Sequence, residues 1–334
     1  MTKRILITGA SGFIGSFLVE EALKRGYEVY AGVRQTSNRN FLKDERISFI
    51  NLNYSSKTEL RMQLLGLKDS GIFFDYIIHN AGITKANKKK TYFTVNCQYT
   101  KNFIKSLIAT GFCPGKFVYI SSLAAFGPGC DAENPIRITD KPNPVTTYGK
   151  SKLKAENYIR SLTGFPYMII RPTAVYGPRE KDIFLYFRLI NRNFEPYIGF
   201  KRQKISLIFV KDLVIAIYKA AESELVNRSY FVSDGQAYSM QDVGQKIKKQ
   251  LSKKTFRFSI PVQFLRVIAF ILERFYSMFG YIPALNLEKV NELKSLNWMC
   301  DTEPLYSDLK FIAEYDLDKG IMETAEWYKN EGWL

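Results

Sequence analysis

Short apolar runs and segments with helical spacing alternate along the first half of the chain. The apolar runs are rich in Ile, Val, Leu and Tyr, which is typical of strands that are buried on both faces of a sheet. They predict strands at residues 4–7, 26–33, 47–52, 75–79, 116–120 and 165–171. Apolar residues at three- and four-residue intervals predict helices at 13–25, 58–67, 92–110 and 146–161. This alternation predicts an α/β fold with a Rossmann-type, doubly wound parallel sheet.

After residue 177 the alternation becomes irregular. Strand-like runs recur at 205–210 and 229–232, and the remaining pattern predicts helices at 182–191, 213–221, 240–251, 262–278, 287–296 and 319–330. We therefore expect a sheet domain over residues 1–177, to which segments near 205–232 partly return. Residues 178–334 are expected to form a smaller, mostly helical lobe.

A turn with three glycines joins the first predicted strand to the first predicted helix. Glycines in this position allow a tight turn and let a pyrophosphate approach the free N–H groups at the helix start. We interpret the turn as a dinucleotide-binding loop, with an ordinary strand–helix turn as the alternative. The residues assigned to binding are Gly9, Ser11, Gly12, Phe13, Ile14 and Gly15.

The ends of the next strands extend this prediction, because ligands of open parallel sheets bind outside the carboxyl ends of the strands. The third strand ends near Asn51 and Leu52, and Asn51 is placed to contact the adenine edge. The fourth strand is followed by Asn80, Ala81 and Gly82. We expect all five residues to line the dinucleotide site.

The end of the second strand bears on which cofactor is bound. A carboxylate at this place accepts hydrogen bonds from the ribose of NAD, whereas an arginine pairs with the 2′-phosphate of NADP. Here the strand ends at Arg34, with Arg39 nearby, and the first acid after it is Asp44. Arg34 therefore favours NADP over NAD, with a plain surface arginine as the alternative.

Polar residues suited to catalysis follow the fifth strand and begin the next helix. Ser121 and Ser122 come directly after residues 116–120, and Tyr148 and Lys152 are four residues apart, so they share one face of a helix. The single histidine, His79, lies at a strand end, and no Gly-x-Ser-x-Gly motif is present, so a Ser–His–Asp triad is disfavoured. We expect His79 to be a packed or hydrogen-bonded residue.

These motifs, taken together, resemble those of the extended short-chain dehydrogenases/reductases, the NAD-dependent epimerase/dehydratase family. The resemblance rests on Thr8–Gly15, Ser122, Tyr148–Lys152 and Arg171–Pro178, which occur in the family's order and spacing. It implies an NAD(P)-dependent oxidoreductase or epimerase that transfers hydride to or from a carbinol or ketone carbon. It also implies a homodimer formed through the helices at 92–110 and 146–161. Residues 178–334 would then bind the substrate.

The resemblance assigns roles to three residues. Tyr148 is the implied acid/base, Lys152 holds the nicotinamide ribose and lowers the tyrosine's pKa, and Ser122 holds the substrate oxygen. A free tyrosine has a pKa near ~10, which a neighbouring ammonium lowers by favouring the phenolate. Pro172 and Thr173 are implied cofactor contacts. Three further Tyr-x-x-x-Lys pairs lack this context, namely Tyr197–Lys201, Tyr306–Lys310 and Tyr315–Lys319.

Two features of the sequence limit the prediction of the substrate. Nucleotide-sugar members of the family often carry an arginine where Ser206 stands here, although Lys201, Arg202 and Lys204 could take its place. Leu123 follows Ser122 where dehydratases carry an acidic pair, so dehydration is disfavoured. A small molecule or a sugar, including a nucleotide sugar, remains the expected substrate. A non-catalytic dinucleotide sensor or assembly protein on the same fold is the alternative function.

Composition adds three expectations. The net charge of +16 arises from dispersed lysines and arginines without a nucleic-acid motif, which favours a basic surface over nucleic-acid binding. The four cysteines are scattered without ligand-like spacing, so we expect no metal and a reducing, cytoplasmic location, and we also expect no signal peptide before the first strand. Charges interrupt the apolar segment 262–279, which predicts a packed helix, with an interfacial membrane helix as the alternative and no stable insertion.

Overall fold

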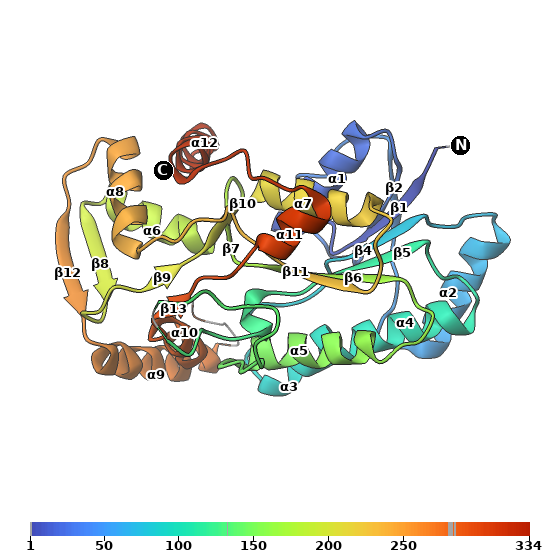
Figure 1. Cartoon of the computed structure of the whole chain (residues 1–334), viewed down its shortest axis with the longest axis horizontal. Helices are drawn as coiled ribbons and strands as arrows, with labels where there is room; N and C mark the ends of the chain where they lie inside the picture. The colour runs from blue at the N-terminus through green and yellow to red at the C-terminus, as the bar shows by residue number, and fades with distance from the viewer. Residues whose placement is uncertain (1, 132, 280–282, 284) are drawn as a thin grey trace. The chain divides into compact units, whose positions relative to one another are not determined.

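A computed structural model describes residues 2–131, 133–279, 283 and 285–334 (Figure 1). The chain divides into two compact units, and each is built from segments that are separate in the sequence. Unit 1 comprises Met1–Ser122, Ser151–Arg171 and Val214–Tyr230, and unit 2 comprises Leu123–Lys150, Pro172–Leu213 and Phe231–Leu334. The division at residue 177 into a dinucleotide-binding domain and a substrate-binding lobe stays a prediction.

Unit 1 is organised around a parallel sheet of seven strands in the order β11-β6-β5-β4-β1-β2-β3. The strands are β1 (Arg4–Thr8), β2 (Glu28–Gly32), β3 (Ile47–Ile50), β4 (Tyr76–His79), β5 (Lys116–Ile120), β6 (Tyr167–Pro172) and β11 (Arg228–Val232). The central strands are buried along their whole length and mostly apolar, as the sequence predicts, although His79, Lys116 and Arg171 lie within them. The order reverses next to β1, so the sheet is doubly wound, and the predicted Rossmann-type fold is confirmed.

Helices cover both faces of this sheet (Figure 1). They are α1 (Phe13–Lys24), α2 (Lys57–Asp69), α3 (Lys89–Tyr92), α4 (Thr100–Ala109), α5 (Thr147–Arg160) and α7 (Val210–Glu222). Side chains of α2, α4 and α5 pack with β1, β4, β5 and β6 in one buried cluster, around Leu64, Phe103 and Phe117. On the other face, α7 contacts α1, where the Tyr218 hydroxyl donates a 2.7 Å hydrogen bond to the Leu18 carbonyl.

The predicted helix at 92–110 has a different internal geometry from the one expected. A π-helical segment, Phe93–Tyr99, lies between α3 and α4. Such segments change the direction of the side chains within a helix and are frequent at functional sites. Asn96 lies in this segment and is fully buried.

Unit 2 combines helices with three two-stranded parallel pairs. The pairs join β7 (Ala174–Tyr176) to β10 (Leu207–Phe209), β8 (Phe194–Ile198) to β12 (Phe256–Ile260), and β9 (Lys204–Ile205) to β13 (Asn297–Trp298). The helices are α6 (Asp182–Asn191), α8 (Met240–Leu251), α9 (Val262–Met278), α10 (Leu287–Leu293), α11 (Glu303–Leu309) and α12 (Leu317–Asn330). Its main core gathers Phe187, Phe209, Ile247 and Tyr328. The C-terminal lobe is mostly helical, as expected.

Candidate active site

The glycine turn between β1 and α1 has the geometry of an anion-binding loop. Gly9 has a φ of +67°, and a Cβ on Gly15 would lie 2.1 Å from the Gly9 carbonyl oxygen, so both positions require glycine. Gly12 is the N-cap of α1, and no side chain caps the helix there or places an acid in its first turn. The helix therefore presents backbone N–H groups and its positive end to the turn, which fits a pyrophosphate.

The loop after β4 is fastened to this turn. The Thr8 hydroxyl accepts a 3.1 Å hydrogen bond from the Ala81 N–H, and the Asn80 amide donates a 3.4 Å bond to the Gly9 carbonyl. A Cβ on Gly9 would lie 2.9 Å from the Cα of Ala81, so the two loops touch through their backbones. The structure thus brings together Gly9, Asn80 and Ala81, which the sequence assigned to one site.

His79 has a structural position at the base of this loop. It is 1% exposed, and its Nδ1 and Nε2 lie 2.9 and 3.0 Å from the hydroxyls of Thr8 and Thr100. Burial, together with the nearby Lys152 ammonium, lowers the pKa of His79 to about 3, so the imidazole is neutral. The expectation of a hydrogen-bonded histidine is confirmed.

Asn96 is a site residue that the sequence analysis missed. Its Oδ1 accepts a 2.8 Å hydrogen bond from the Ile83 N–H, and its Nδ2 donates 3.0 Å bonds to the Ile83 carbonyl and the Ser151 hydroxyl. It therefore ties the loop after β4 to helix α5. The only signal in the sequence is that Asn96 places an amide on the apolar face of an otherwise amphipathic helix.

Lys152 projects from α5 toward the ends of β4 and β5. The side chain is nearly buried at 4% exposure, and its Nζ donates a 2.8 Å hydrogen bond to the Ile120 carbonyl. A Cβ on Gly82 would lie 3.3 Å from this Nζ, so the lysine lies directly against the loop that follows β4. Burial lowers the pKa of Lys152 to about 8, and the nearby Glu156 carboxylate opposes this shift.

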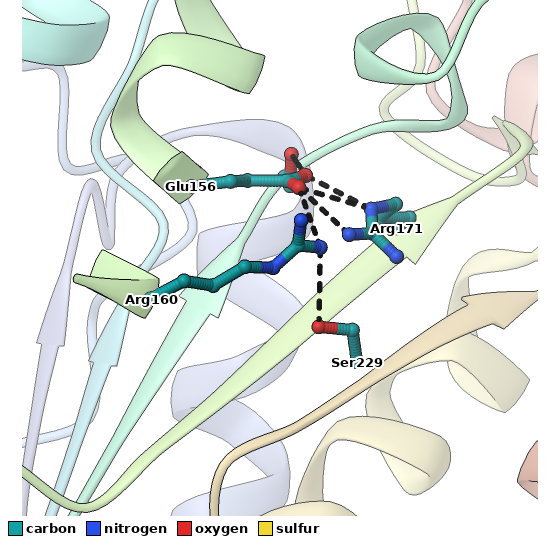
Figure 2. A network of polar contacts seen from close by, with 5 residues as sticks. Glu156, Arg160, Arg171 and Ser229 are labelled. Carbon is teal, nitrogen blue, oxygen red and sulfur yellow. Dashed lines mark hydrogen bonds and ion pairs between the residues drawn. The ribbon is translucent and has the colours of Figure 1, made fainter. Parts of the chain in front are cut away.

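A buried ion pair joins α5 to β6 (Figure 2). The Glu156 carboxylate accepts hydrogen bonds from the Arg171 guanidinium at 2.7 and 3.0 Å, and both side chains are completely buried. Arg160 reaches the same carboxylate at 3.2 Å and lies beside Ser229 in Figure 2. The Ser121 hydroxyl also donates to Glu156. Ser121 is thereby held in the network.

The first turn of α5 carries Tyr148 and belongs to unit 2. The Thr146 hydroxyl accepts a 3.0 Å hydrogen bond from the Gly149 N–H, and a Cβ on Gly149 would lie 2.0 Å from the Ala124 carbonyl oxygen. Thr147 donates to Glu288 through its backbone N–H and through its hydroxyl, the latter at 2.8 Å. These contacts fix the start of the helix and hence the backbone that carries Tyr148.

The four Tyr-x-x-x-Lys pairs differ in their structural setting. Tyr148 and Lys152 lie within one helix, one turn apart. Tyr197 lies in β8, Lys310 is the left-handed C-cap of α11, and Tyr315 precedes α12. Tyr148–Lys152 is thus the one pair of the four that shares a helical face.

The end of β2 carries the residues that bear on the cofactor. Arg34 is exposed, and its backbone N–H donates a 3.0 Å bond to the Ser37 hydroxyl. The Arg39 guanidinium lies over the Phe49 ring at 4.3 Å from its centroid. Asp44 pairs with Arg46 at 2.6 Å, and this contact lowers the pKa of the carboxyl to about 2. Asp44, the first acidic residue after β2, is therefore already paired with Arg46.

Other assigned residues have mixed surroundings. The Asn51 carbonyl accepts a 3.1 Å bond from Gln63, whereas the side chain of Leu52 belongs to the hydrophobic core. In unit 2, the Thr173 N–H and hydroxyl both donate to the Val232 carbonyl, at 3.1 and 3.2 Å. The hydroxyl of Ser206 is also bonded within the protein, to the Gln236 carbonyl.

The fold and this loop geometry are typical of α/β proteins that bind a dinucleotide. The sequence profile of the NAD dependent epimerase/dehydratase family matches residues 5–232. The chain belongs to this family, as the motifs of the sequence indicate, and its members' reactions are NAD-dependent epimerisations, dehydrations and reductions.

Similar proteins include enzymes of different kinds. A UDP-glucose 4-epimerase of Vibrio cholerae is 30% identical over 275 residues, which are 78% of this chain and 80% of that protein. A ceramide reductase of Caulobacter vibrioides is 22% identical over 333 residues, 99% of this chain and 96% of its own. Among solved structures, the UDP-glucose 4-epimerase of Thermotoga maritima with UDP-glucose has a TM-score of 0.79 at 19% identity, over 98% and 99% of the two chains. The latter likeness shows the fold.

Among the described residues, no helix is both long and apolar enough to cross a bilayer.

Proposed function

We propose that the protein is an NADP-dependent enzyme that transfers hydride to or from a carbinol or ketone carbon of a small-molecule or sugar substrate. Tyr148 is the acid/base, Lys152 tunes its pKa and holds the nicotinamide ribose, and Ser122 binds the substrate oxygen. The observation that carries the proposal is Lys152, a nearly buried ammonium one helical turn after Tyr148 and bonded to the carbonyl of Ile120.

The chemistry follows from the charge of this lysine. Its pKa of about 8 leaves it mostly protonated at neutral pH, so a positive charge stands on the face of α5 that Tyr148 shares. A cation at this spacing favours the phenolate over the phenol and brings the tyrosine toward the range of an efficient acid/base. The bound nicotinamide would supply or accept the hydride. Tyr148 would give the carbonyl oxygen its proton in reduction and remove the hydroxyl proton in oxidation.

The glycine turn and the loop after β4 are the proposed dinucleotide site. The uncapped N-terminus of α1 suits the pyrophosphate, and Lys152 lies against Gly82 where the ribose would approach. At the end of β2, Arg34 is exposed and Asp44 is held by Arg46, so a cation and not a carboxylate is available to the adenosine ribose. This arrangement favours NADP over NAD.

The relatives suggest which carbonyl compounds to test. Their names include a UDP-glucose 4-epimerase, a ceramide reductase and a 3-beta-hydroxysteroid dehydrogenase, so sugars and lipids are both represented. In this chain the side chains of Lys201, Arg202 and Lys204 are exposed in unit 2 and could bind a substrate diphosphate. Ser206, at the place of the family's arginine, is bonded within the protein, so it does not take that role.

A homodimer through α4 and α5 stays a prediction, which light scattering would check.

The test is cofactor oxidation across a panel of 4-keto nucleotide sugars, steroid-like ketones and simple aldehydes, with NADPH and NADH in parallel. Tyr148→Phe removes the proton donor and should lower kcat by about 100-fold or more without changing cofactor affinity. Tyr306→Phe is the matched control, because Tyr306 has the same spacing to a lysine but is 47% exposed on α11.

The outcomes separate the possibilities. Turnover that is lost in Tyr148→Phe and kept in Tyr306→Phe supports the proposal and identifies the substrate class. Turnover that survives Tyr148→Phe overturns the role of the tyrosine. Cofactor binding without turnover of ketones or interconversion of sugar epimers would point to a non-catalytic dinucleotide-binding protein.

A further inference from the structure

Helix α9 of unit 2 has a second apolar face, which is exposed. Five residues at intervals of three and four form it, and we call them the outer stripe: Phe264, Val267, Ile271, Phe275 and Met278. Their exposed fractions are 60%, 55%, 58%, 57% and 80%. Large apolar side chains in such a row on a protein surface mark an interaction site, because a single exposed residue is common and a contiguous stripe is not.

The opposite face of α9 fixes the direction of the outer stripe. Leu265 and Ala269 pack with Val290 of α10 in a small core. The Glu273 carboxylate accepts a 2.9 Å hydrogen bond from the Leu287 N–H at the start of α10. Both contacts involve the inner face of the helix, so the outer stripe faces away from α10. Figure 1 shows α10 alongside α9 within unit 2.

The stretch of sequence that leads into α9 and runs through most of it is strongly basic. Residues 246–274 contain a single acid, Glu273, and that carboxylate is bonded to the Leu287 N–H. The same segment contains eight cations: Lys246, Lys248, Lys249, Lys253, Lys254, Arg257, Arg266 and Arg274. Three of them pair with acids from other segments, as Lys246 does with Asp318 and as Lys248 and Arg257 do with Glu195. The positive charge of the segment still exceeds its negative charge by a wide margin.

Exposed aromatic residues also occur in and after β8 and in β12, the strand that precedes α9. Phe256 in β12 is 69% exposed and pairs in register with Phe194 of β8, which is 50% exposed. Phe200, which follows β8, is 82% exposed. Aromatic side chains together with dispersed cations are the composition of surfaces that lie in a lipid interface.

We propose that α9 docks this protein on the surface of an anionic lipid bilayer, with the outer stripe inserted among the acyl chains at the interface and the basic residues over the headgroups. The charge argues for lipid rather than for a second copy of the chain, because two such basic segments would repel each other across a self-interface. The mode is peripheral, since no described helix is suited to span the bilayer.

Co-sedimentation with vesicles tests the proposal. Vesicles of equal parts phosphatidylcholine and phosphatidylglycerol should bind the protein, and vesicles of phosphatidylcholine alone should bind it much less. Raising the salt from ~0.1 M to ~1 M shortens the Debye length from ~10 Å to ~3 Å and should weaken the binding. The probe is the vesicle itself, so the result does not depend on the proposed enzymatic function.

The decisive variant is Phe264→Ser/Ile271→Ser/Phe275→Ser, which should lower the partition coefficient by about tenfold or more, since three large apolar side chains are lost from the interface. The control is Met62→Ser/Ile312→Ser, which removes side chains that are 62% and 71% exposed outside α9 and should leave binding unchanged. Circular dichroism checks that both variants fold. A separate variant, Ile271→Trp, should be quenched by brominated lipid, which reports insertion without any loss of side chain.

The proposal is overturned by three results. One is the absence of binding to the anionic vesicles, and another is binding that the stripe variant does not reduce. The third is a dimer that the stripe variant converts to monomer, together with no binding to vesicles. That result would show that the outer stripe holds two copies of the chain together.

Discussion

Replacing Glu156 by glutamine would test how far the buried ion pair stabilises unit 1. The variant keeps the side chain's volume but removes the charge that Arg171 contacts at 2.7 Å, where both side chains are completely buried. An arginine left in the interior without its counter-charge costs about 3–5 kcal/mol, because its lost hydration is no longer compensated. With a urea m-value of ~3 kcal/mol/M, the unfolding midpoint should fall by about 1–1.7 M.

The control for this variant is Glu222→Gln. Glu222 pairs with Arg25 at 2.8 Å, but the two side chains remain 33% and 26% exposed, so water compensates for most of the loss. Its expected cost is about 1 kcal/mol or less. Urea unfolding followed by circular dichroism measures both variants. If Glu156→Gln shifts the urea midpoint no more than Glu222→Gln does, the buried pair is solvated or replaceable, contrary to the reasoning from burial.

The remaining predictions concern the dinucleotide site. Gly15→Ala should lower both stability and cofactor affinity, because its Cβ would lie 2.1 Å from a carbonyl oxygen, whereas Gly66→Ala in α2 meets nothing within 4 Å and should stabilise by about 0.5–1 kcal/mol; thermal unfolding and cofactor titration check both. The pKa of Lys152 falls from 10.5 to about 8 on folding, so between these pH values the unfolded chain binds more protons than the folded one. The free energy of unfolding should therefore rise by about 3 kcal/mol as the pH rises from about 8 to 10.5. Urea unfolding of Lys152→Met should lack this rise, and an equal rise in the variant would contradict the assignment. Arg34→Ala should raise KM for NADPH by about tenfold with little change for NADH, and equal effects on the two cofactors would refute the 2′-phosphate role.

The sheet and its glycine turn could be predicted because their signals are local. Each buried strand is a short apolar run, and the helix after Gly12 begins where the spacing changes. The pairs β8–β12 and β9–β13 could not be predicted. β8 contains Pro196, and its partner lies about sixty residues further along the chain, while β9 and β13 have two residues each. Such strands are defined by their pairing and have no pattern of their own.

The candidate site shows the same division between local and non-local signals. Tyr148 and Lys152 could be selected as candidates because their spacing is helical and their position follows a serine-bearing strand end, and the structure places them one turn apart in α5. Glu156 looks like an ordinary helix residue until the fold places Arg171, fifteen residues later, against it. Asn96 depends on a π-helical segment, and seven residues are too few for its longer period to be seen in the sequence. Both missed residues make their contacts only after the strands have assembled.

The edge strand β11 has a consequence for how the chain is made. β11 lies beside β6, although residues 173–227 separate the two strands in the sequence. The buried ammonium of Lys116 also bonds to the Ala220 carbonyl, which belongs to helix α7. A nascent chain that ends before residue 228 therefore leaves β6 as an open edge, and one that ends before residue 220 also leaves Lys116 without this acceptor. Completion of the sheet must wait until about two thirds of the chain has left the ribosome, so a fragment cut at residue 177 would be prone to aggregate through β6.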